Sequence, residues 1–387
     1  MNTQLDPEID AQQPNVNSFV HLLFGLHSYL QNEMVIPNSL RRALAALTFE
    51  QGNRFPKTLY QFIVLCHQPV SDWYPLPIPN DFNRSQAILY DRCLSDEAQD
   101  YYLTLTEQME LPPLAQEDIP QAALDNWIMI ELRQRLKDSP DASAAQDLYM
   151  RVRSFLIEHS WTTPDRLRAQ TPAVFQELRQ FYDYMPSLPV DELLVCDRCG
   201  LLEWRNGRWQ GIKPSFCSDH GSGSPHVHTI PNTRGLFRLR EGTHLRTFLP
   251  GRLELALFTF AESMRDQYPD QVPSVERYPG LDTYDLRLNF VDESWAVDAK
   301  DQTNPARLAS QIHAFYNEGD LSHLHAFYVI PDARMEDVNY REQLERRTAG
   351  VVSAHLHIVS VSEFQQHIEE KLKTLINPPR QKKGKKD

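Results

Sequence analysis

Two short segments near the C-terminus alternate polar and apolar residues, as half-buried strands do. Residues 285–290 read Asp-Leu-Arg-Leu-Asn-Phe, and residues 295–301 read Trp-Ala-Val-Asp-Ala-Lys-Asp. Two adjacent strands of this kind place Asp285, Asp298 and Lys300 on one face of a sheet. Charged side chains inside an apolar strand are costly unless they have partners. The segments therefore predict a strand pair that carries a polar site.

The pairing of these strands decides which side chains meet. A tight turn at residues 292–293 places Asp298 opposite Arg287. The same turn places Lys300 opposite Asp285, so that all four side chains share one face. A slip of one residue would move the whole set to the other face. The pairing is therefore an expectation that the tertiary structure has to test.

The two aspartates suit a divalent cation. Mg²⁺ takes oxygen ligands and binds through one or two carboxylates plus a substrate phosphate, a role for Asp285 and Asp298. The metal can polarise a phosphodiester and lower the pKa of an attacking water. Lys300 can orient or deprotonate that water, or stabilise the charge developing on the phosphate. Glu254, on an expected preceding helix, is a third candidate carboxylate, and Asp282 competes with Asp285 for the first position.

The alternative interpretation is a surface hairpin whose aspartates and lysine form ordinary salt bridges, since short Asp-x-Lys strings are common. The surroundings favour a catalytic site, because a helix with Glu254 precedes the strand pair and strands alternating with helices follow it. The sequence therefore predicts a metal-dependent nuclease.

With 387 residues the chain is too long for one ordinary core, so several domains are expected. It is 41% hydrophobic, which suits globular domains, and no apolar run approaches the ~20 residues of a membrane span. The acidic, polar N-terminus is not a secretory signal, so a soluble cytoplasmic protein is expected. The predicted parts are a mainly α-helical scaffold or partner-binding region (1–190), a small zinc-ribbon-like module (191–230), an α/β domain with a mixed central sheet (231–376) and a basic tail (377–387).

The apolar spacing predicts particular elements. In the N-terminal region it predicts helices at residues 21–34, 38–51, 146–160 and 172–185, and irregular proline-rich segments at 69–81 and 109–120. Asn38 is a candidate N-cap. In the C-terminal region it predicts helices at 251–266, 304–319, 341–347 and 362–376, and further strands at 323–330 and 355–361. Strands flanked by helices indicate an α/β domain.

Three of the five cysteines form a cluster with a histidine. Cys196 and Cys199 are separated by two residues, and 17 residues later Cys217 and His220 repeat the same spacing. An odd number of cysteines argues against a disulfide framework. Zn²⁺ prefers four tetrahedral thiolate or imidazole ligands, and two paired turns supply them. The spacing predicts a structural zinc site.

Details of this cluster remain open. Gly200 and Gly221 follow the two pairs and suit knuckle turns. The alternatives are buried free cysteines, or a site that uses His226 or His228 in place of His220. A closed four-ligand site points to a structural metal rather than a catalytic one.

Charge is segregated along the chain. The formal net charge is −13, yet residues 204–252 carry eight arginines and lysines against two acidic residues. These basic residues and the tail can follow a phosphate backbone, although a lysine-rich end is most often a solvated, disordered segment. Tryptophans and arginines at 204–209 can contact bases and phosphates, or pack a small core. The strand histidines (His323, His325, His355, His357) are expected to be structural.

The order of helix with Glu254, strand with Asp285, strand with Asp298-Ala-Lys300, helix and strand resembles the PD-(D/E)xK restriction-endonuclease-like superfamily. The wider text, including VERYPGLDTYDLRLNF and WAVDAKDQTNPARLA, is similar to the bacterial restriction endonuclease (REase) encoded beside PIWI-RE proteins and a DinG-type helicase. The resemblance covers residues 193–375. The proline of the motif lies at Pro279, several residues before Asp285, which leaves the choice between Asp282 and Asp285 open.

The resemblance implies that Asp285 and Asp298 bind Mg²⁺, that Lys300 assists hydrolysis and that Glu254 supports them, with a weaker match at Gln311. It implies a DNA endonuclease of a bacterial antiviral or anti-plasmid defence system, with a PIWI-type protein and a DinG-type helicase as partners. Two alternatives remain, a non-catalytic nucleic-acid-binding or assembly subunit of such a complex and an RNA nuclease. No base-reading element is visible.

Overall fold

The structure is a computed structural model in which the described residues are 16–31, 36–90, 93–107, 121–185, 191–205, 208–211, 217, 220, 224–232 and 235–377. The chain divides into two compact units. The first comprises Met1–Met129, Lys213–Phe216 and Arg240–Gly242, and the second comprises Ile130–Ile212, Cys217–Leu239 and Thr243–Asp387. Residues 1–190, expected as one helical region, are thus shared between the two units. No helix among these residues has the length and apolar character that crossing a bilayer requires.

The first unit is helical. Its elements are α1 (Val16–Gln31), α2 (Asn38–Gln51), η1 (Gly52–Arg54), α3 (Leu59–Cys66), α4 (Val70–Trp73), β1 (Leu89–Tyr90), β2 (Cys93–Leu94) and α5 (Asp96–Glu107). Aromatic side chains fill its core, where Phe19 lies edge-on to Tyr74 (5.4 Å) and to Phe82 (4.7 Å). The helices expected at 21–34 and 38–51 are therefore present.

Two local expectations in this unit are wrong. Asn38 is the first residue of α2 rather than its N-cap, because the cap position belongs to Pro37, which makes no side-chain bond. The segment at 69–81 contains one helical turn, α4, whose Tyr74 amide donates to the Val70 carbonyl at 3.0 Å. The proline-rich segment at 109–120 lies outside the described residues.

Helices and three small sheets form the first part of the second unit. The helices are α6 (Gln121–Lys137, which begins in the first unit), α7 (Ala142–Glu158), α8 (Pro164–Arg168) and α9 (Pro172–Leu178). The strands are β3 (Trp161–Thr162), β4 (Tyr182–Tyr184), β5 (Glu192–Cys196), β6 (Gly200–Leu201), β7 (Glu203–Arg205), β8 (Arg208–Gln210), β9 (Val227–Pro231) and β10 (Phe237–Leu239). They pair in the orders β3-β10-β4, β6-β5-β9 and β7-β8.

The helix expected at 172–185 is too long. It ends at Leu178, and the chain continues as β4, which pairs antiparallel with β10. The buried Tyr182 fixes this strand, because its hydroxyl donates to the His159 carbonyl at 2.6 Å. A long-range strand partner has therefore replaced helix propagation.

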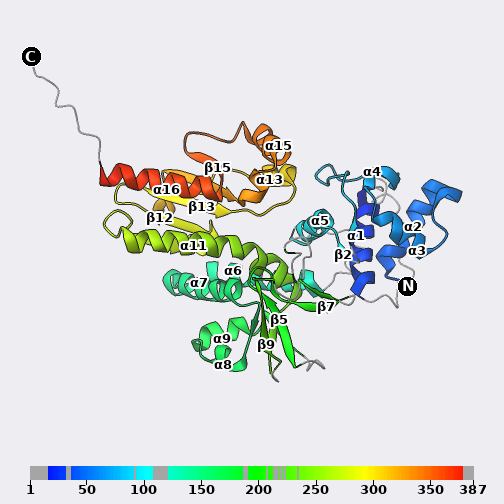
Figure 1. Ribbon diagram of the computed structural model, residues 1–387, viewed down its shortest axis with the longest axis horizontal. Helices are drawn as coiled ribbons and strands as arrows, with labels where there is room; N and C mark the ends of the chain where they lie inside the picture. The colour runs from blue at the N-terminus through cyan, green and yellow to red at the C-terminus, as the bar shows by residue number, and fades with distance from the viewer. Residues whose placement is uncertain are drawn as a thin grey trace, which may run out of the picture. The chain divides into compact units, whose positions relative to one another are not determined.

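A mixed five-stranded sheet forms the C-terminal part of the second unit (Figure 1). Its strands are β11 (Ser274–Arg277), β12 (Leu286–Asn289), β13 (Ser294–Ala299), β14 (His325–Ile330) and β15 (Leu356–Ser360), in this spatial order. The first three pair antiparallel, and β13, β14 and β15 pair parallel. The expected mixed α/β sheet is confirmed.

Helices cover both faces of this sheet. The helical elements that follow β10 in the chain are α10 (Glu241–Thr243, mostly in the first unit), the π-helix η3 (His244–Phe248), α11 (Leu249–Gln267), α12 (Pro279–Asp282), α13 (Pro305–Gln311), η4 (Gly319–Leu321), α14 (Asp332–Met335), α15 (Val338–Thr348) and α16 (Val361–Ile376). Leu308 and Leu344, from α13 and α15, pack against one face at Tyr328. On the other face Phe327 contacts Phe364 of α16, with ring centroids 5.2 Å apart.

The helix expected at 304–319 ends at Gln311, which is its last residue and is exposed. Beyond it the chain turns back to the sheet, because the Tyr328 hydroxyl bonds both the amide (3.3 Å) and the carbonyl (3.1 Å) of His313. Phe315 then packs edge-on against the Tyr328 ring at 4.8 Å. Side-chain contacts with β14 thus end the helix early.

The register of the strand pair differs from the expectation by two residues. Arg287 pairs with Ala296 rather than with Asp298. The same shift means that Lys300 is not opposite Asp285. A shift of two residues leaves each side chain on its original face, whereas a shift of one would not. The predicted common face therefore survives although the predicted partners were wrong.

The turn of this hairpin also lies one residue earlier than residues 292–293. The Phe290 amide donates to the Glu293 carbonyl at 2.7 Å, so residues 291–292 form the tip. Trp295 fixes this turn. Its ring packs against Phe290 with centroids 4.7 Å apart, and its indole N–H donates to the Glu293 carboxylate at 2.7 Å. Burying Trp295 has set the register.

Within the second unit, α7 packs closely against α11, which in turn packs against the sheet (Figure 1). Gly251, in the first turn of α11, allows this approach, because a Cβ atom there would lie 2.2 Å from Cγ2 and 2.7 Å from Cβ of Ile157. The Ile157 side chain branches at that Cβ and is fully buried, so it cannot move aside.

We expect Gly251→Ala to lower the free energy of unfolding of the second unit by about 1–3 kcal/mol, because overpacking forces α7 and α11 apart. Urea denaturation followed by tryptophan fluorescence would measure this loss. Gly350→Ala is the matched control, since a Cβ at Gly350 meets nothing within 4 Å. Equal midpoints for both variants would contradict the role of Gly251.

Candidate active site and candidate metal centre

Asp298 and Lys300 lie at the C-terminal end of β13. Asp298 is the fifth residue of the strand, and Lys300 follows the strand with its amide bonded to the Val329 carbonyl at 2.9 Å. The Lys300 ammonium donates to the Asp298 carboxylate at 2.8 Å. Both side chains are partly exposed, at 33% for Lys300 and 18% for Asp298. The pair is thus accessible from solvent at a strand end.

Asp285 immediately precedes β12 and turns its carboxylate toward β13. Its amide donates to the Val297 carbonyl at 3.0 Å, and its Oδ2 accepts from the Ala299 amide at 2.7 Å. The residue is buried. The structure therefore brings Asp285, Asp298 and Lys300 together at one sheet edge, as the sequence analysis expected.

Like charges meet at this edge. Burial raises the pKa of the Asp285 carboxyl well above its ordinary value, and the carboxylates of Glu254 and Asp298 act in the same direction. Burial acts to lower the pKa of Lys300, but the neighbouring Asp298 and Asp285 outweigh it and raise that pKa. A group of carboxylates that repel one another is relieved by a bound cation, so the arrangement can hold a divalent metal.

Glu254 lies on α11 and is buried. Both of its carboxylate oxygens have protein partners. Oε1 accepts from the Arg153 guanidinium at 2.8 Å, and Oε2 accepts from the Tyr278 hydroxyl at 2.7 Å. Glu254 is close enough to Asp285 to influence its pKa. The structure therefore places Glu254 beside the predicted site, held by other side chains.

Asp282, the competitor of Asp285, is held differently. Its carboxylate pairs with Arg153 at 3.3 Å and accepts from the Tyr149 hydroxyl at 2.7 Å. Asp285 instead bonds a β13 amide, next to Asp298. This geometry favours Asp285 as the first metal ligand, and the choice stays a prediction.

Sequence reasoning missed the contribution of α7. Tyr149 and Arg153 reach the carboxylates of Asp282 and Glu254, although α7 lies about a hundred positions earlier in the chain. A polar and an aromatic residue four apart on an otherwise amphipathic helix was the available signal. Spacing alone did not show which face of α7 would be buried against the sheet.

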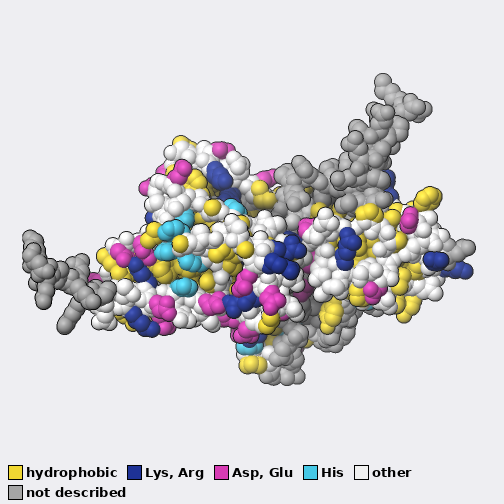
Figure 2. Space-filling model, turned by 90° about the horizontal axis from the view of Figure 1, so that it is seen from above, with side chains coloured by type: hydrophobic (Ala, Val, Ile, Leu, Met, Phe, Trp, Pro, Cys, Tyr) yellow, Lys and Arg dark blue, Asp and Glu magenta, His cyan; other side chains and the backbone are white. Residues whose placement is uncertain are grey.

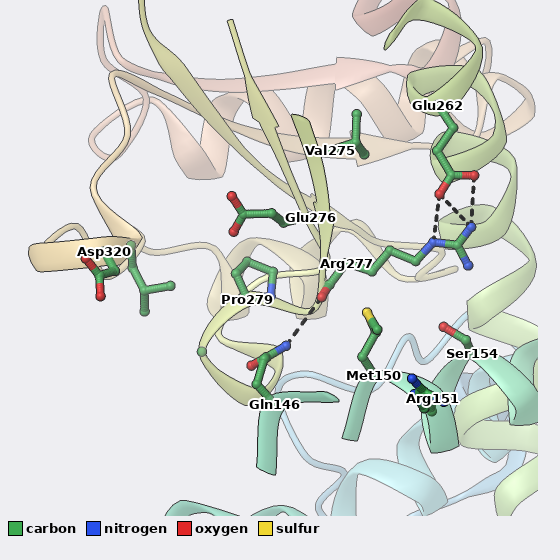
Figure 3. A pocket seen from close by; sticks show the side chains of 12 residues that line it. Gln146, Met150, Arg151, Ser154, Glu262, Val275, Glu276, Arg277, Pro279 and Asp320 are labelled. Atoms are coloured by element: carbon green, nitrogen blue, oxygen red, sulfur yellow. Dashed lines mark hydrogen bonds and ion pairs between the residues drawn. The ribbon is translucent and has the colours of Figure 1, made fainter. Parts of the chain in front are cut away.

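A cavity of about 620 Å³ lies beside this region and is lined from α7, α11, β11, α12 and η4 (Figure 3). Arg277 crosses it to form a two-pronged ion pair with Glu262, with both N–O distances near 3 Å. Gln146 reaches toward the backbone of residues 277–278 from the other side. Pro279 and Gly280, a few residues before Asp285, line this cavity.

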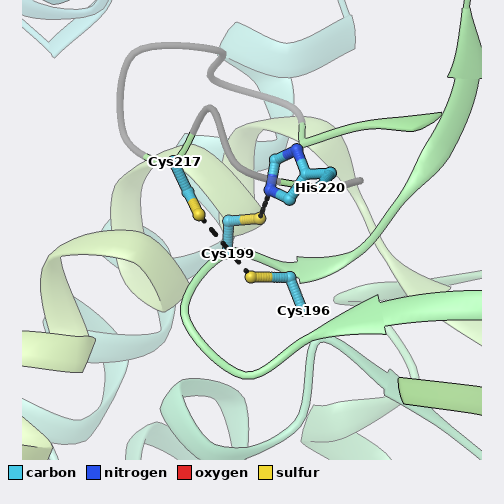
Figure 4. A group of neighbouring side chains, drawn as sticks. All are labelled: Cys196, Cys199, Cys217 and His220. Carbon is cyan, nitrogen blue, oxygen red and sulfur yellow. Dashed lines mark hydrogen bonds between the residues drawn. The ribbon is translucent and has the colours of Figure 1, made fainter. Parts of the chain in front are cut away.

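The predicted cysteine and histidine ligands converge. Cys196 ends β5, Cys199 precedes β6, and the ligand atoms of these two residues, Cys217 and His220 all lie within 4.8 Å of one another (Figure 4). All four residues are buried. Cys196 Sγ lies 3.7 Å from Cys217 Sγ, and Cys199 Sγ lies 3.1 Å from His220 Nε2. This group can bind a metal such as zinc.

The turn that carries Cys196 and Cys199 is fixed from outside. Gly200 has a left-handed φ of +84°, as expected for a knuckle turn, whereas Gly221 lies outside the described residues. The buried His244 bonds the Cys199 carbonyl at 2.8 Å, and Arg252, at the start of α11, donates to the Asp197 carbonyl at 2.9 Å. The candidate metal centre is thus attached to the helix that carries Glu254.

Some basic residues of the segment 204–252 form ion pairs within the protein. Arg238 pairs with Glu203 at 2.8 Å, and Arg240 pairs with Asp125 at 3.3 Å. The side chains at 204–208 and the whole C-terminal tail lie outside what the structure describes. Contact of these basic residues with a phosphate backbone stays a prediction.

Histidines gather on one face of the second unit (Figure 2). His325 Nδ1 lies 3.0 Å from His357 Nε2, and the ring centroids of His355 and His367 lie within 6 Å of these rings. His323 instead packs edge-on against Tyr284 at 5.8 Å. Within the described residues, the group that brings three or more ligand atoms together is the Cys196 cluster.

Residues 251–375 match the protein family described as "REase associating with pPIWI_RE". The matched region includes Glu254, Asp285, Asp298 and Lys300, and it begins at Gly251, the third residue of α11. No curated protein and no solved structure shows a significant match to the chain.

We expect the purified protein to contain about one zinc ion per chain, and Cys199→Ser to lose it and to unfold at a lower temperature, because the binding energy of a structural metal is part of the folding energy. Elemental analysis and thermal melting would measure both. Cys93→Ser, which removes a cysteine outside the cluster, is the control. Zinc retained in Cys199→Ser would remove this residue from the ligand set.

Proposed function

We propose that this chain is a metal-dependent DNA endonuclease of a bacterial defence system, because residues 251–375 match the family of REases associating with pPIWI_RE. The observation that carries the proposal is the convergence of Asp285, Asp298 and Lys300 at one sheet edge. Two carboxylates and a cation at an accessible edge are suited to a metal and a phosphodiester.

Asp285 and Asp298 would hold Mg²⁺, which supplies Lewis-acid polarisation of the phosphate and a more acidic bound water. The bond from the Ala299 amide to Oδ2 orients the Asp285 carboxylate toward β13. Asp298 is more exposed and can contact both a cation and the lysine. Asp285 would therefore bind the metal alone, whereas Asp298 would bind both the metal and the Lys300 ammonium.

Lys300 would act as a positive charge. Its ammonium donates to the Asp298 carboxylate at 2.8 Å, which places the charge beside the proposed metal ligands. A protonated amine cannot accept a proton from water, but it can donate to a phosphate oxygen or to the attacking water. Charge stabilisation is therefore the role that best suits Lys300 among those the sequence left open.

Glu254 would support the site without being its principal ligand. Each of its oxygens already accepts a hydrogen bond, from Arg153 and from Tyr278. Its remaining lone pairs can still accept from a metal-bound water. Its negative charge adds to the field at Asp285, which favours binding of a cation.

Partners follow from the family. The family name implies association with pPIWI_RE proteins. We also propose a DinG-type helicase as a second partner. The same proposal includes a zinc ion at the Cys196 cluster and a cytoplasmic location, where the DNA lies. Because no base-reading element is visible, partners are expected to direct the enzyme to its DNA.

We expect the wild-type protein to nick or cut plasmid DNA with Mg²⁺ or Mn²⁺ and not with EDTA. Asp298→Asn and Lys300→Met should each lower the cleavage rate by about 10²-fold or more, because each removes a charge aimed at the reacting phosphate. Gel assays with plasmid DNA and with RNA would measure the rates. Faster cleavage of RNA would instead support the RNA nuclease.

The matched controls are Asp292→Asn, at the tip of the same hairpin, and Lys373→Met, an exposed lysine on α16. Both should cut like the wild type. Equal cleavage by Asp298→Asn and wild type would remove the site assignment. A wild type that stays inert with its PIWI-type and helicase partners would favour the non-catalytic assembly subunit.

A further inference from the structure

We propose that α7 is a positioning element of the candidate active site, and that Arg153 is its central positioning residue. This inference rests on the proposed function. It concerns residues that precede the matched family region, which begins at residue 251. Gln146, Tyr149 and Arg153 lie three and four positions apart, so they share one helix face. That face points at the segment joining β11 to β12.

This segment, residues 278–282, has an unusual backbone. Tyr278, Leu281 and Asp282 have φ angles of 52°, 56° and 72°, a left-handed region that side chains with a Cβ rarely adopt. Gly280 is also left-handed, at 63°. Such conformations persist only where the surroundings hold them, and they are found at functional sites. Three residues later the chain reaches Asp285.

Polar side chains from α7 hold both ends of the segment. The Gln146 amide donates to the Tyr278 carbonyl at 2.8 Å, and its oxygen accepts from the Leu281 amide at 2.8 Å. One side chain therefore satisfies two backbone groups of the strained turn. The Tyr149 hydroxyl binds the Asp282 carboxylate at 2.7 Å. The α6 residue Arg133 donates to the Asp282 carbonyl, also at 2.7 Å.

Arg153 joins this segment to α11. Its guanidinium binds Glu254 at 2.8 Å and Asp282 at 3.3 Å, and it lies over the Tyr278 ring at 4.8 Å from the centroid. The side chain is only 12% exposed, and the contacts it makes in the structure are to these protein groups. A guanidinium has a planar fork of donors that can hold two carboxylates at once. Arg153 thereby fixes the distance between Glu254 and the turn that leads to Asp285.

The consequence concerns placement of the metal ligands. Without Arg153, the carboxylates of Glu254 and Asp282 would lose the positive charge that lies between them, and the turn would lose one of its attachments to α11. Asp285 would then lose the fixed direction that its bond to the Ala299 amide provides. A displacement of 1 Å at a reacting site costs about 10²-fold in rate.

The test compares Arg153→Met with Arg151→Met, an exposed arginine on the same helix that pairs with Asp147. We expect Arg153→Met to lower kcat about 10²-fold and to raise the Mg²⁺ concentration needed for half-maximal cleavage, with the KM for DNA unchanged. Arg153→Lys should restore part of the rate, because an ammonium replaces the charge but not the fork. Arg151→Met should match the wild type in every readout.

A second readout is independent of cleavage. Hydrogen exchange of the amides at 278–286 should become faster in Arg153→Met and Gln146→Ala but not in Arg151→Met. If the wild type cuts nothing, the proposed function fails, and faster exchange in both variants still supports the positioning role. The positioning role would be overturned if Arg153→Met kept the kcat, the Mg²⁺ dependence and the hydrogen exchange of the wild type. If Arg153→Met does not fold, Tyr149→Phe and Gln146→Ala take its place with the same expected directions.

Discussion

The geometry of the second unit depends on neutralising several carboxylates that lie close together at one edge of its mixed sheet. Glu254, Asp282, Asp285 and Asp298 come from α11, α12, the start of β12 and β13. Charges of one sign cannot be buried together without compensation. Arg153 supplies it on the side of α7, and Lys300 supplies it on the open side. The remaining negative charge is what a divalent cation would take up.

This compensation connects parts of the protein that are far apart in sequence. Arg153 lies on α7, and Gly251 lets α7 approach α11 closely enough for the ion pair with Glu254 to form. Arg252, one residue later, holds the turn of the candidate metal centre at Asp197. The first turns of α11 therefore contact the candidate metal centre, α7 and the candidate active site.

Much of the site could be predicted from local sequence. The alternation in 285–290 and 295–301 depends only on the two-residue period of a strand, and the shared face of Asp298 and Lys300 follows from it. The four candidate metal ligands could be found because their spacing recurs in paired turns. The register could not, because burial of Trp295 against Phe290, a tertiary contact, placed the turn at residues 291–292. The lengths of the helices near 178 and 311 also depended on distant partners, Tyr182 and Tyr328.

The sequence by itself determined which residue types were available, their strand and helix periods, and the spacing of the metal ligands, because these are properties of neighbouring positions. Only the tertiary structure decided that Asp282 pairs with Arg153 while Asp285 turns toward β13. It also decided that both oxygens of Glu254 are already bonded. These outcomes depend on the packing of α7 against α11, a helix about a hundred residues later in the chain. No local pattern encodes which distant charge will compensate a buried carboxylate, since that choice is made by three-dimensional proximity in a medium of low dielectric constant.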